Sequence, residues 1–135
     1  MDSVSLKCPV TIKAKVTEAL KKHMLEEMKS NIEKVDLELQ QIDIQAKRVL
    51  GQQAQENIQG VAGIRQQVEM EKQKRFEFKQ QVEQKIEETE HLEIGAEIVQ
   101  GTLERIVEVK VGDDMRELMN VEILVEDGKI IALRS

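Results

Sequence analysis

The feature that most constrains this chain is an apolar stripe within residues 28–49, whose members follow one another at alternating spacings of four and three. This spacing keeps side chains on one side of an α-helix and is typical of a coiled-coil seam. Almost all the residues between them are Glu, Lys, Gln or Asp, so one narrow face needs a partner helix and the rest faces water. The stripe consists of Met28, Ile32, Val35, Leu39, Ile42, Ala46 and Val49.

The helical pattern begins at Thr17, a good N-cap residue, and continues without Pro or Gly to Leu50. Three glycines then interrupt it, each costing a helix interior about 1 kcal/mol relative to Ala. They are Gly51, Gly60 and Gly63. The pattern resumes at Ile64 and runs to about His91, but Arg75 and Lys79 lie near its apolar line and weaken it. That line consists of Val68, Phe78, Val82, Ile86, Thr89 and Leu92.

Two arrangements fit this pattern: one straight helix of about 74 residues, near 110 Å long, in an antiparallel dimer, or a helical hairpin with its turn near residues 56–63. We favour the hairpin, because it brings the C-terminal segment back beside the N-terminal strand. Antiparallel partners in the hairpin have numbers that sum to about 117 at equal rise per residue. This register places Leu39 level with Phe78 and Val35 level with Val82, so we expect Phe78 to be buried.

Both ends of the chain have the pattern of β-strands. Residues 7–16 alternate strictly, with Cys8 and Val10 on the apolar side, and residues 102–111 alternate in the same way. Asp127-Gly128 lies between two apolar runs and predicts a type I′ hairpin. In that hairpin Glu126 faces Lys129, Val125 faces Ile130, Leu124 faces Ile131 and Ile123 faces Ala132.

The predicted fold class is therefore α+β. A long antiparallel coiled-coil helical hairpin over residues 17–92 stands on a small antiparallel β-module formed by residues 7–16 and 93–135. A hydrophobic core of this size is marginally stable without disulfides or a metal site, and self-association would stabilise it.

Composition narrows the functional classes. With 34% charged and 1% aromatic residues, the chain has too few large apolar side chains for a large hydrophobic core. Its net charge of -6 argues against a dedicated nucleic-acid binder, which needs an excess of Lys and Arg. Two local basic clusters remain, and we interpret both as solvated surface: Lys13, Lys15, Lys21 and Lys22, and Lys72, Lys74, Arg75 and Lys79. We predict a cytoplasmic protein, because the sequence has one cysteine and no signal-peptide pattern. We predict no membrane span, because no apolar run approaches about 18 residues.

Four groups of residues were weighed as chemical sites. His23 and His91 with Glu87 and Glu90 offer metal-binding side chains, but a single His near a Glu-rich helix end is ordinary surface. The other three are the thiol of Cys8, the neighbouring carboxylates Asp113 and Asp114, and a methionine-rich patch of Leu20, Met24, Leu25 and Met28. We interpret them as a buried structural cysteine, turn residues and helical core. No nucleotide-binding glycine loop is present, so we predict no catalytic, cofactor-binding or metal-binding residue and no small-molecule substrate.

The C-terminal third resembles the closing segment of the YlqD family of small bacterial proteins. The resemblance is carried by LEIGAEI at 92–98, VEVKVGD at 107–113 and the Asp127-Gly128 hairpin. The opening VTIKAKVTEALKKHMLEEM at 10–28 is similar to that family's first strand and helix start. The middle matches only as an interrupted coiled coil, with glycines where other members contain proline. The resemblance implies no activity and no site residues, and only the genomic neighbourhood of some members implies a role around translation.

We therefore expect a non-enzymatic structural or interaction protein that forms homo-oligomers through the coiled coil, the β-module or both, and that has a protein partner of unknown identity. The alternative is an RNA- or ribosome-associated factor that uses the first basic cluster. Its association with RNA must weaken as salt rises, because phosphate contacts release counterions.

Overall fold

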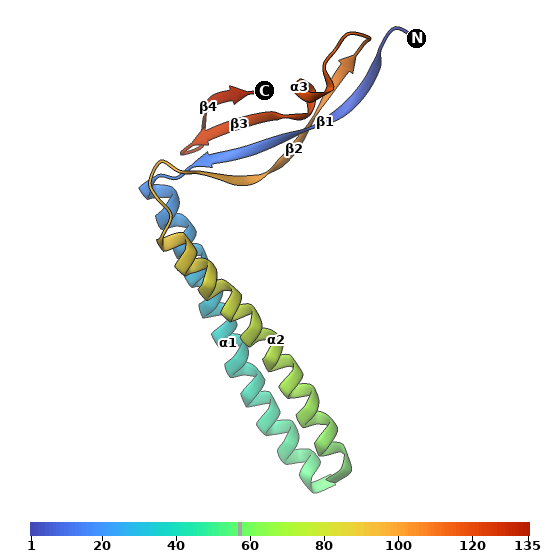
Figure 1. Cartoon of the computed structure of the whole chain (residues 1–135). Coiled ribbons are helices and arrows are strands. Elements are labelled where there is room, and N and C mark those ends of the chain that lie inside the picture. The colour runs from blue at the N-terminus through green and yellow to red at the C-terminus, as the bar shows by residue number, and fades with distance from the viewer. Residues whose placement is uncertain (57) are drawn as a thin grey trace. The chain divides into compact units, whose positions relative to one another are not determined.

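The structure is a computed structural model that describes residues 1–56 and 58–135, leaving aside the side chains of residues 53–59 (Figure 1). The chain divides into two units. A sheet unit comprises Met1–Lys22 and Leu92–Ser135, and a helical unit comprises His23–His91. The sheet unit therefore draws on both ends of the chain, and the helical unit is the segment between them.

The sheet unit is built on β1 (Val4–Lys15), an inner strand of a four-stranded sheet of order β2-β1-β3-β4. β2 (Glu97–Val109) is antiparallel to β1, β3 (Val121–Glu126) is parallel to β1, and β4 (Lys129–Arg134) is antiparallel to β3. The α+β class and the joint sheet of both chain ends are confirmed. The purely antiparallel sheet is wrong, because the connection after β2 crosses β1 and returns β3 in the direction of β1.

That connection contains a short helix, α3 (Met115–Met119), directly after Asp113 and Asp114, which were interpreted only as turn residues. Asp114 is its N-cap, with a side-chain oxygen 2.9 Å from the backbone nitrogen of Arg116. Glu117 follows three residues later, and this Asp-x-x-Glu spacing is the sequence signal that predicts such a helix start. α3 packs beside β1.

Side chains of β1 alternate between two faces of the sheet, as predicted. Cys8, Val10 and Ala14 are buried, as is Val16 just beyond the strand. Opposed residues of neighbouring strands share a face. Face A thus comprises Cys8, Val10, Ile12, Ala14, Leu103, Arg105, Val107, Val121, Ile123 and Leu133. Face B comprises Lys7, Pro9, Lys13, Lys15, Glu97, Glu104, Ile106, Glu122, Leu124 and Arg134.

The two halves of β1 have different neighbours. β3 begins opposite Val10, so residues 4–9 of β1 pair only with β2 and form a two-stranded ribbon with residues 104–109. Pro9 lies in this ribbon, where a missing N–H leaves no gap in a ladder to β3. The ribbon is thus the thinnest part of the sheet.

The turn between β3 and β4 has positive φ at both central residues, 48° at Asp127 and 84° at Gly128, as a type I′ turn requires. The predicted pairs Glu126–Lys129 and Val125–Ile130 are confirmed. The next two pairs are wrong, because the register shifts and leaves Ile131 as an extra residue in β4. Leu124 consequently pairs with Ala132, and Ile123 pairs with Leu133.

Thr17 begins the helical segment as predicted. Its Oγ1 accepts a hydrogen bond from the backbone N–H of Leu20 at 3.1 Å and donates one to Oδ1 of Asp127 at 2.7 Å. The returning chain is fixed at the same place, because Gly95 donates to the carbonyl of Val16 at 2.8 Å and Val16 donates to that of Ala96 at 2.7 Å. One hydroxyl therefore caps a helix and anchors the β3–β4 turn.

The helical unit is a hairpin of α1 (Glu18–Glu56) and α2 (Ile58–Glu90), as predicted (Figure 1). The glycines do not end these helices: Gly51 lies within α1, and Gly60 and Gly63 lie within α2. Of the residues 56–63 expected to form the turn, Glu56 belongs to α1 and Ile58 onward belong to α2, while Asn57 lies outside the described residues.

The seam between the helices is apolar only in part. Val35 of α1 and Val82 of α2 are buried as expected, at 5% and 7% exposure, and Thr89 is buried at 5%. The prediction for Phe78 is wrong, since its side chain is 45% exposed. Half-buried Arg75 and Lys79 occupy the seam positions around it and reach across to α1.

Ion pairs between described residues join the two helices. Lys79 lies 2.8 Å from Asp36, Arg75 lies 3.1 Å from Glu38, and Lys72 contacts Asp43. The numbers of the paired residues sum to 113–115, while those of the buried valines Val35 and Val82 sum to the expected 117. The long cations of α2 reach acidic residues of α1, and the side chain of Phe78 remains largely exposed.

Candidate interaction surfaces

The residues weighed as chemical sites do not form a reaction centre in the part of the chain that is described. No group of three or more His, Cys, Asp or Glu side chains among these residues is placed to hold a metal ion. His23 lies 3.9 Å from Glu27, its neighbour one turn along the same helix. Cys8 is fully buried in the sheet.

Asp113 and Asp114 have structural partners. Asp113 accepts a hydrogen bond from the backbone N–H of Lys110 at 2.9 Å, and Asp114 caps α3. Hydrogen bonds from the side chain and backbone N–H of Arg116 hold the pKa of Asp114 below its ordinary value. Both carboxylates therefore shape the turn after β2.

Most members of the basic clusters contact acidic groups or carbonyls within the chain. In the first cluster, Lys13 lies 2.9 Å from Glu122, and the Lys21 ammonium donates to the carbonyl of Leu92 at 3.0 Å. The second cluster supplies the ion pairs between the helices. Lys74 lies 3.9 Å from Glu71, which also accepts from Arg75 at 2.8 Å. These contacts offset the positive charge that a phosphate backbone would need.

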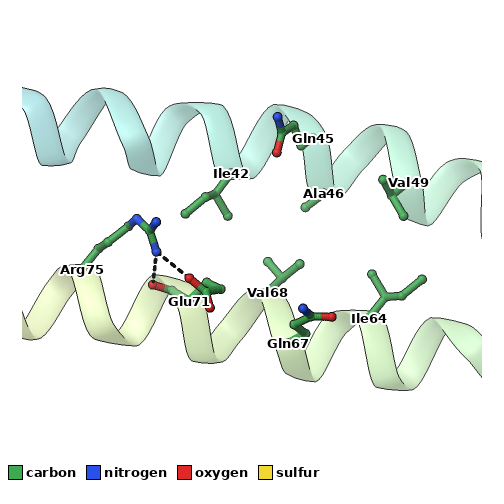
Figure 2. A pocket seen from close by; sticks show the side chains of 9 residues that line it. All are labelled: Ile42, Gln45, Ala46, Val49, Ile64, Gln67, Val68, Glu71 and Arg75. Carbon is green, nitrogen blue, oxygen red and sulfur yellow. Dashed lines mark hydrogen bonds and ion pairs between the residues drawn. The ribbon is translucent and has the colours of Figure 1, made fainter.

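A groove of about 330 Å³ lies between α1 and α2 (Figure 2). Ile42, Ala46 and Val49 of α1 point toward Ile64 and Val68 of α2. The small side chain of Ala46 leaves the space. The groove is also lined by Gln45, Gln67, Glu71 and Arg75.

The polar rim of this groove is held by Arg75. Its guanidinium contacts the side chain and the backbone carbonyl of Glu71 as well as the carboxylate of Glu38. The hydrogen bond from Arg75 lowers the pKa of Glu71, and the contacts with Glu71 and Glu38 raise the pKa of Arg75. An arginine already committed to two carboxylates is a structural clamp across the hairpin.

A second, larger groove of about 650 Å³ lies over the sheet. Val10, Val121 and Ile123 form its floor on face A, and Leu118 of α3 adds to it. Leu103 of β2 and Leu133 of β4 flank it and are 63% and 73% exposed. Its rim carries charges of both signs from Glu104, Arg105, Glu117 and Arg134.

Face B carries an ionic network across the sheet. Arg134 of β4 contacts Glu97 of β2 at 2.5 Å, and it lies 3.9 Å from Glu122 of β3. Glu122 in turn pairs with Lys13 of β1. The hydrogen bond from Arg134 lowers the pKa of Glu97. This network joins all four strands, including the two edge strands.

β2 is an edge strand that is exposed on both faces. Leu103 is exposed on face A, and Val99 and Ile106 on face B are 65% and 74% exposed. Its outer backbone edge has no neighbour in the described sheet. A long edge with apolar side chains is a typical place for association with another strand.

This chain is similar over most of its length to a protein family and to a solved structure. The model of the family described as "YlqD protein" matches residues 4–134. A solved structure from Synechococcus sp. WH 8102, titled as a crystal structure of a protein of unknown function, is similar over 98% of this chain and 95% of that chain. Its sequence identity is 30%, and the TM-score is 0.81. The comparison with curated proteins found no match.

The helices of the described segments were also compared with the requirements of a bilayer. None of them combines enough length with enough apolar character to span a membrane.

Proposed function

This chain belongs to the YlqD family, and from that premise we propose that it is a non-enzymatic interaction protein that self-associates in the cytoplasm and presents its helical hairpin to a protein partner. The observation that carries the proposal is the exposure of apolar side chains on the sheet unit. Contiguous exposed apolar surface beyond scattered single residues is characteristic of an interaction site.

The balance between buried and exposed apolar residues in the sheet unit supports self-association. The buried ones are small apart from Leu124: Cys8, Val10, Ala14 and Val16. Most of the exposed ones are larger, and three are valines: Met1, Val4, Ile94, Val99, Leu103, Ile106, Val111, Met115, Met119, Ile130, Ile131 and Leu133. A small unit with this distribution gains stability when another surface covers the exposed group.

The chemistry of the described residues supports a non-enzymatic role. The thiol of Cys8 is fully buried, and several carboxylates are held in ion pairs or in a helix cap. The free thiol also suits a reducing compartment such as the cytoplasm. An RNA-binding role gains no support from the basic clusters, since Lys13, Lys21 and Arg75 interact within the chain.

Sedimentation equilibrium of the whole protein tests the proposal. We expect an oligomer at micromolar concentration that persists as salt rises from low to moderate ionic strength, because burial of apolar surface does not depend on counterion release. A monomer at tens of micromolar would contradict self-association. Co-sedimentation with ribosomes or RNA that disappears with added salt would favour the alternative role. Affinity capture followed by mass spectrometry then identifies the protein partner.

A further inference from the structure

The helical hairpin has two parts that differ in packing. The first part, which we call the base, comprises residues 23–43 of α1 and 72–90 of α2. It contains the interhelical ion pairs described above, of which Lys72 with Asp43 marks its end. It also contains the buried side chains of the helical unit among the described residues. These are Val35, Val82 and Thr89. Buried groups and paired charges therefore hold the two helices together along the base.

The second part, which we call the distal part, comprises residues 44–52 of α1 and 60–71 of α2. None of the side chains described in these two ranges is buried, and the seam residue Val49 is 39% exposed. No ion pair between the two ranges is found among the described residues. Gly51 and Gly63 weaken the helices further, because glycine is a poor helix former. The distal part thus lacks the contacts that close the base.

Two grooves flank the seam in the distal part. The groove of about 330 Å³ described above and another of about 350 Å³ share Ala46 and Val68 as lining residues. The first also reaches Gln45 and the second Lys47, which lie on opposite sides of Ala46 around α1. Figure 2 shows the short side chain of Ala46 across from Val68. The helices are therefore under-packed on both sides at this level.

The position of the two grooves separates this feature from ordinary fraying. Helix ends fray over about one or two residues. Ala46 and Val68 each lie about three turns from the helix ends at Glu56 and Ile58. Proteins open locally in cooperative units, and units with few buried apolar contacts open at the lowest cost in free energy.

We infer that the distal part of the hairpin opens by itself, so that α1 and α2 separate beyond the Asp43 and Lys72 pair while the base stays closed. The inference does not depend on self-association. Opening exposes Val49, Ile64 and Val68, so a partner that covers these apolar side chains favours the open form. The chain thus has a hairpin whose distal part changes shape without loss of the base.

Hydrogen exchange of the whole protein, followed by mass spectrometry, tests the inference. We expect amide protection factors at residues 44–50 and 64–70 to be at least about tenfold lower than those at 30–40 and 75–85. This comparison uses the wild type and needs no variant. Equal protection in the two parts would overturn the inference.

A variant that fills the space beside Ala46 tests the cause. Ala46→Leu adds apolar atoms between the grooves, and we expect exchange in the distal part to slow about tenfold with the base unchanged. Ala62→Leu is the matched control, because it adds the same atoms at an exposed position of α2 that lines neither groove. We expect it to change exchange by less than about twofold. If Ala46→Leu slows exchange no more than Ala62→Leu, the grooves do not set the opening and the inference is wrong.

The boundary of the opening unit is tested at Asp43. Asp43→Asn removes the last interhelical ion pair of the base, and we expect protection at residues 39–43 and 72–75 to fall about threefold. Glu33→Gln, an exposed charge change within the base, should leave these amides unchanged. Unchanged protection in Asp43→Asn would overturn the assignment of this pair as the boundary. Circular dichroism checks the helix content of each variant.

Discussion

The two units of this chain are held together by different interactions. In the sheet unit, β1 carries most of the buried apolar side chains and is joined to its neighbours by backbone ladders. In the helical unit, the seam is buried at Val35, Val82 and Thr89, and ion pairs between described residues span the polar stretch near its middle. A chain with few aromatic residues can thus combine two kinds of stabilisation. Its sheet has a small apolar core, and its long helical hairpin is joined partly by ion pairs.

The largest expected effect is in the sheet unit. Leu124→Ala removes a side chain that is only 6% exposed, and we expect a loss of about 2–4 kcal/mol in the free energy of unfolding, measured by urea denaturation. Leu37→Ala is the matched control, because Leu37 is 58% exposed on α1. If Leu37→Ala lowered the free energy of unfolding as much as Leu124→Ala, the stability of the chain would not depend on whether the leucine is buried.

The next effect separates buried from exposed positions along α2. Val82→Ala removes carbon groups from a buried position, at about 0.8 kcal/mol for each buried methylene equivalent, so we expect a loss of about 1.5 kcal/mol. Phe78→Ala removes a larger side chain that is 45% exposed, and we expect it to cost less. Thermal unfolding followed by circular dichroism at 222 nm measures both. The reverse order would show that Phe78 is covered in solution.

A smaller effect tests the charged part of the hairpin. Asp36→Asn with Asp43→Asn removes two of the interhelical pairs, and we expect a lower melting temperature, with a loss smaller than that of Val82→Ala. The loss should shrink as salt rises, because ions screen exposed pairs. Glu33→Gln, an exposed charge change on α1, serves as the control. Equal losses at low and high salt would argue against an electrostatic contribution.

The smallest effect concerns the pH dependence of the sheet network. Arg134 lowers the pKa of Glu97 in the folded state, so this pair stabilises the fold above the unfolded pKa and the contribution is lost as pH falls through the folded pKa. Arg134→Gln should therefore lower the melting temperature slightly at pH 7 and have no effect well below pH 4. A difference that persists in acid would assign the role of Arg134 to packing.

The sequence predicts those parts of the fold that follow from local pattern. Thr17 starts α1, the β1 alternation is correct, and Asp127-Gly128 makes the expected turn. The parallel β1–β3 pair was missed because strand direction depends on how α3 crosses the sheet, although Asp114 and Glu117 signal that helix. Phe78 was predicted to lie in the seam from apolar periodicity alone. That pattern does not show that the long side chains of Arg75 and Lys79 can form ion pairs with acidic residues of α1.

The candidate surfaces were only partly accessible from sequence. Alternation in residues 102–111 indicated a strand, but an outer edge exists only once the strand order is known. The network of Glu97, Glu122 and Arg134 likewise joins residues from three strands. A local sequence pattern does not predict which strands lie next to one another. The marginal size of the sheet unit favours self-association, and its exposed apolar residues are the surface for which we propose it.

The position of β1 at the inside of the sheet has a consequence for synthesis. Lys15 pairs with Glu97 and Val4 with Val109, so β1 is made long before any of its partners. At about 5–20 residues per second, the ribosome needs on the order of ten seconds to make the helical segment between them. During this time the nascent β1 has both edges open, while α1 and α2 can pair as soon as they emerge. Early closure of the hairpin then holds β1 near the place where β2 will arrive, so the sheet forms only after the hairpin that connects its first two strands.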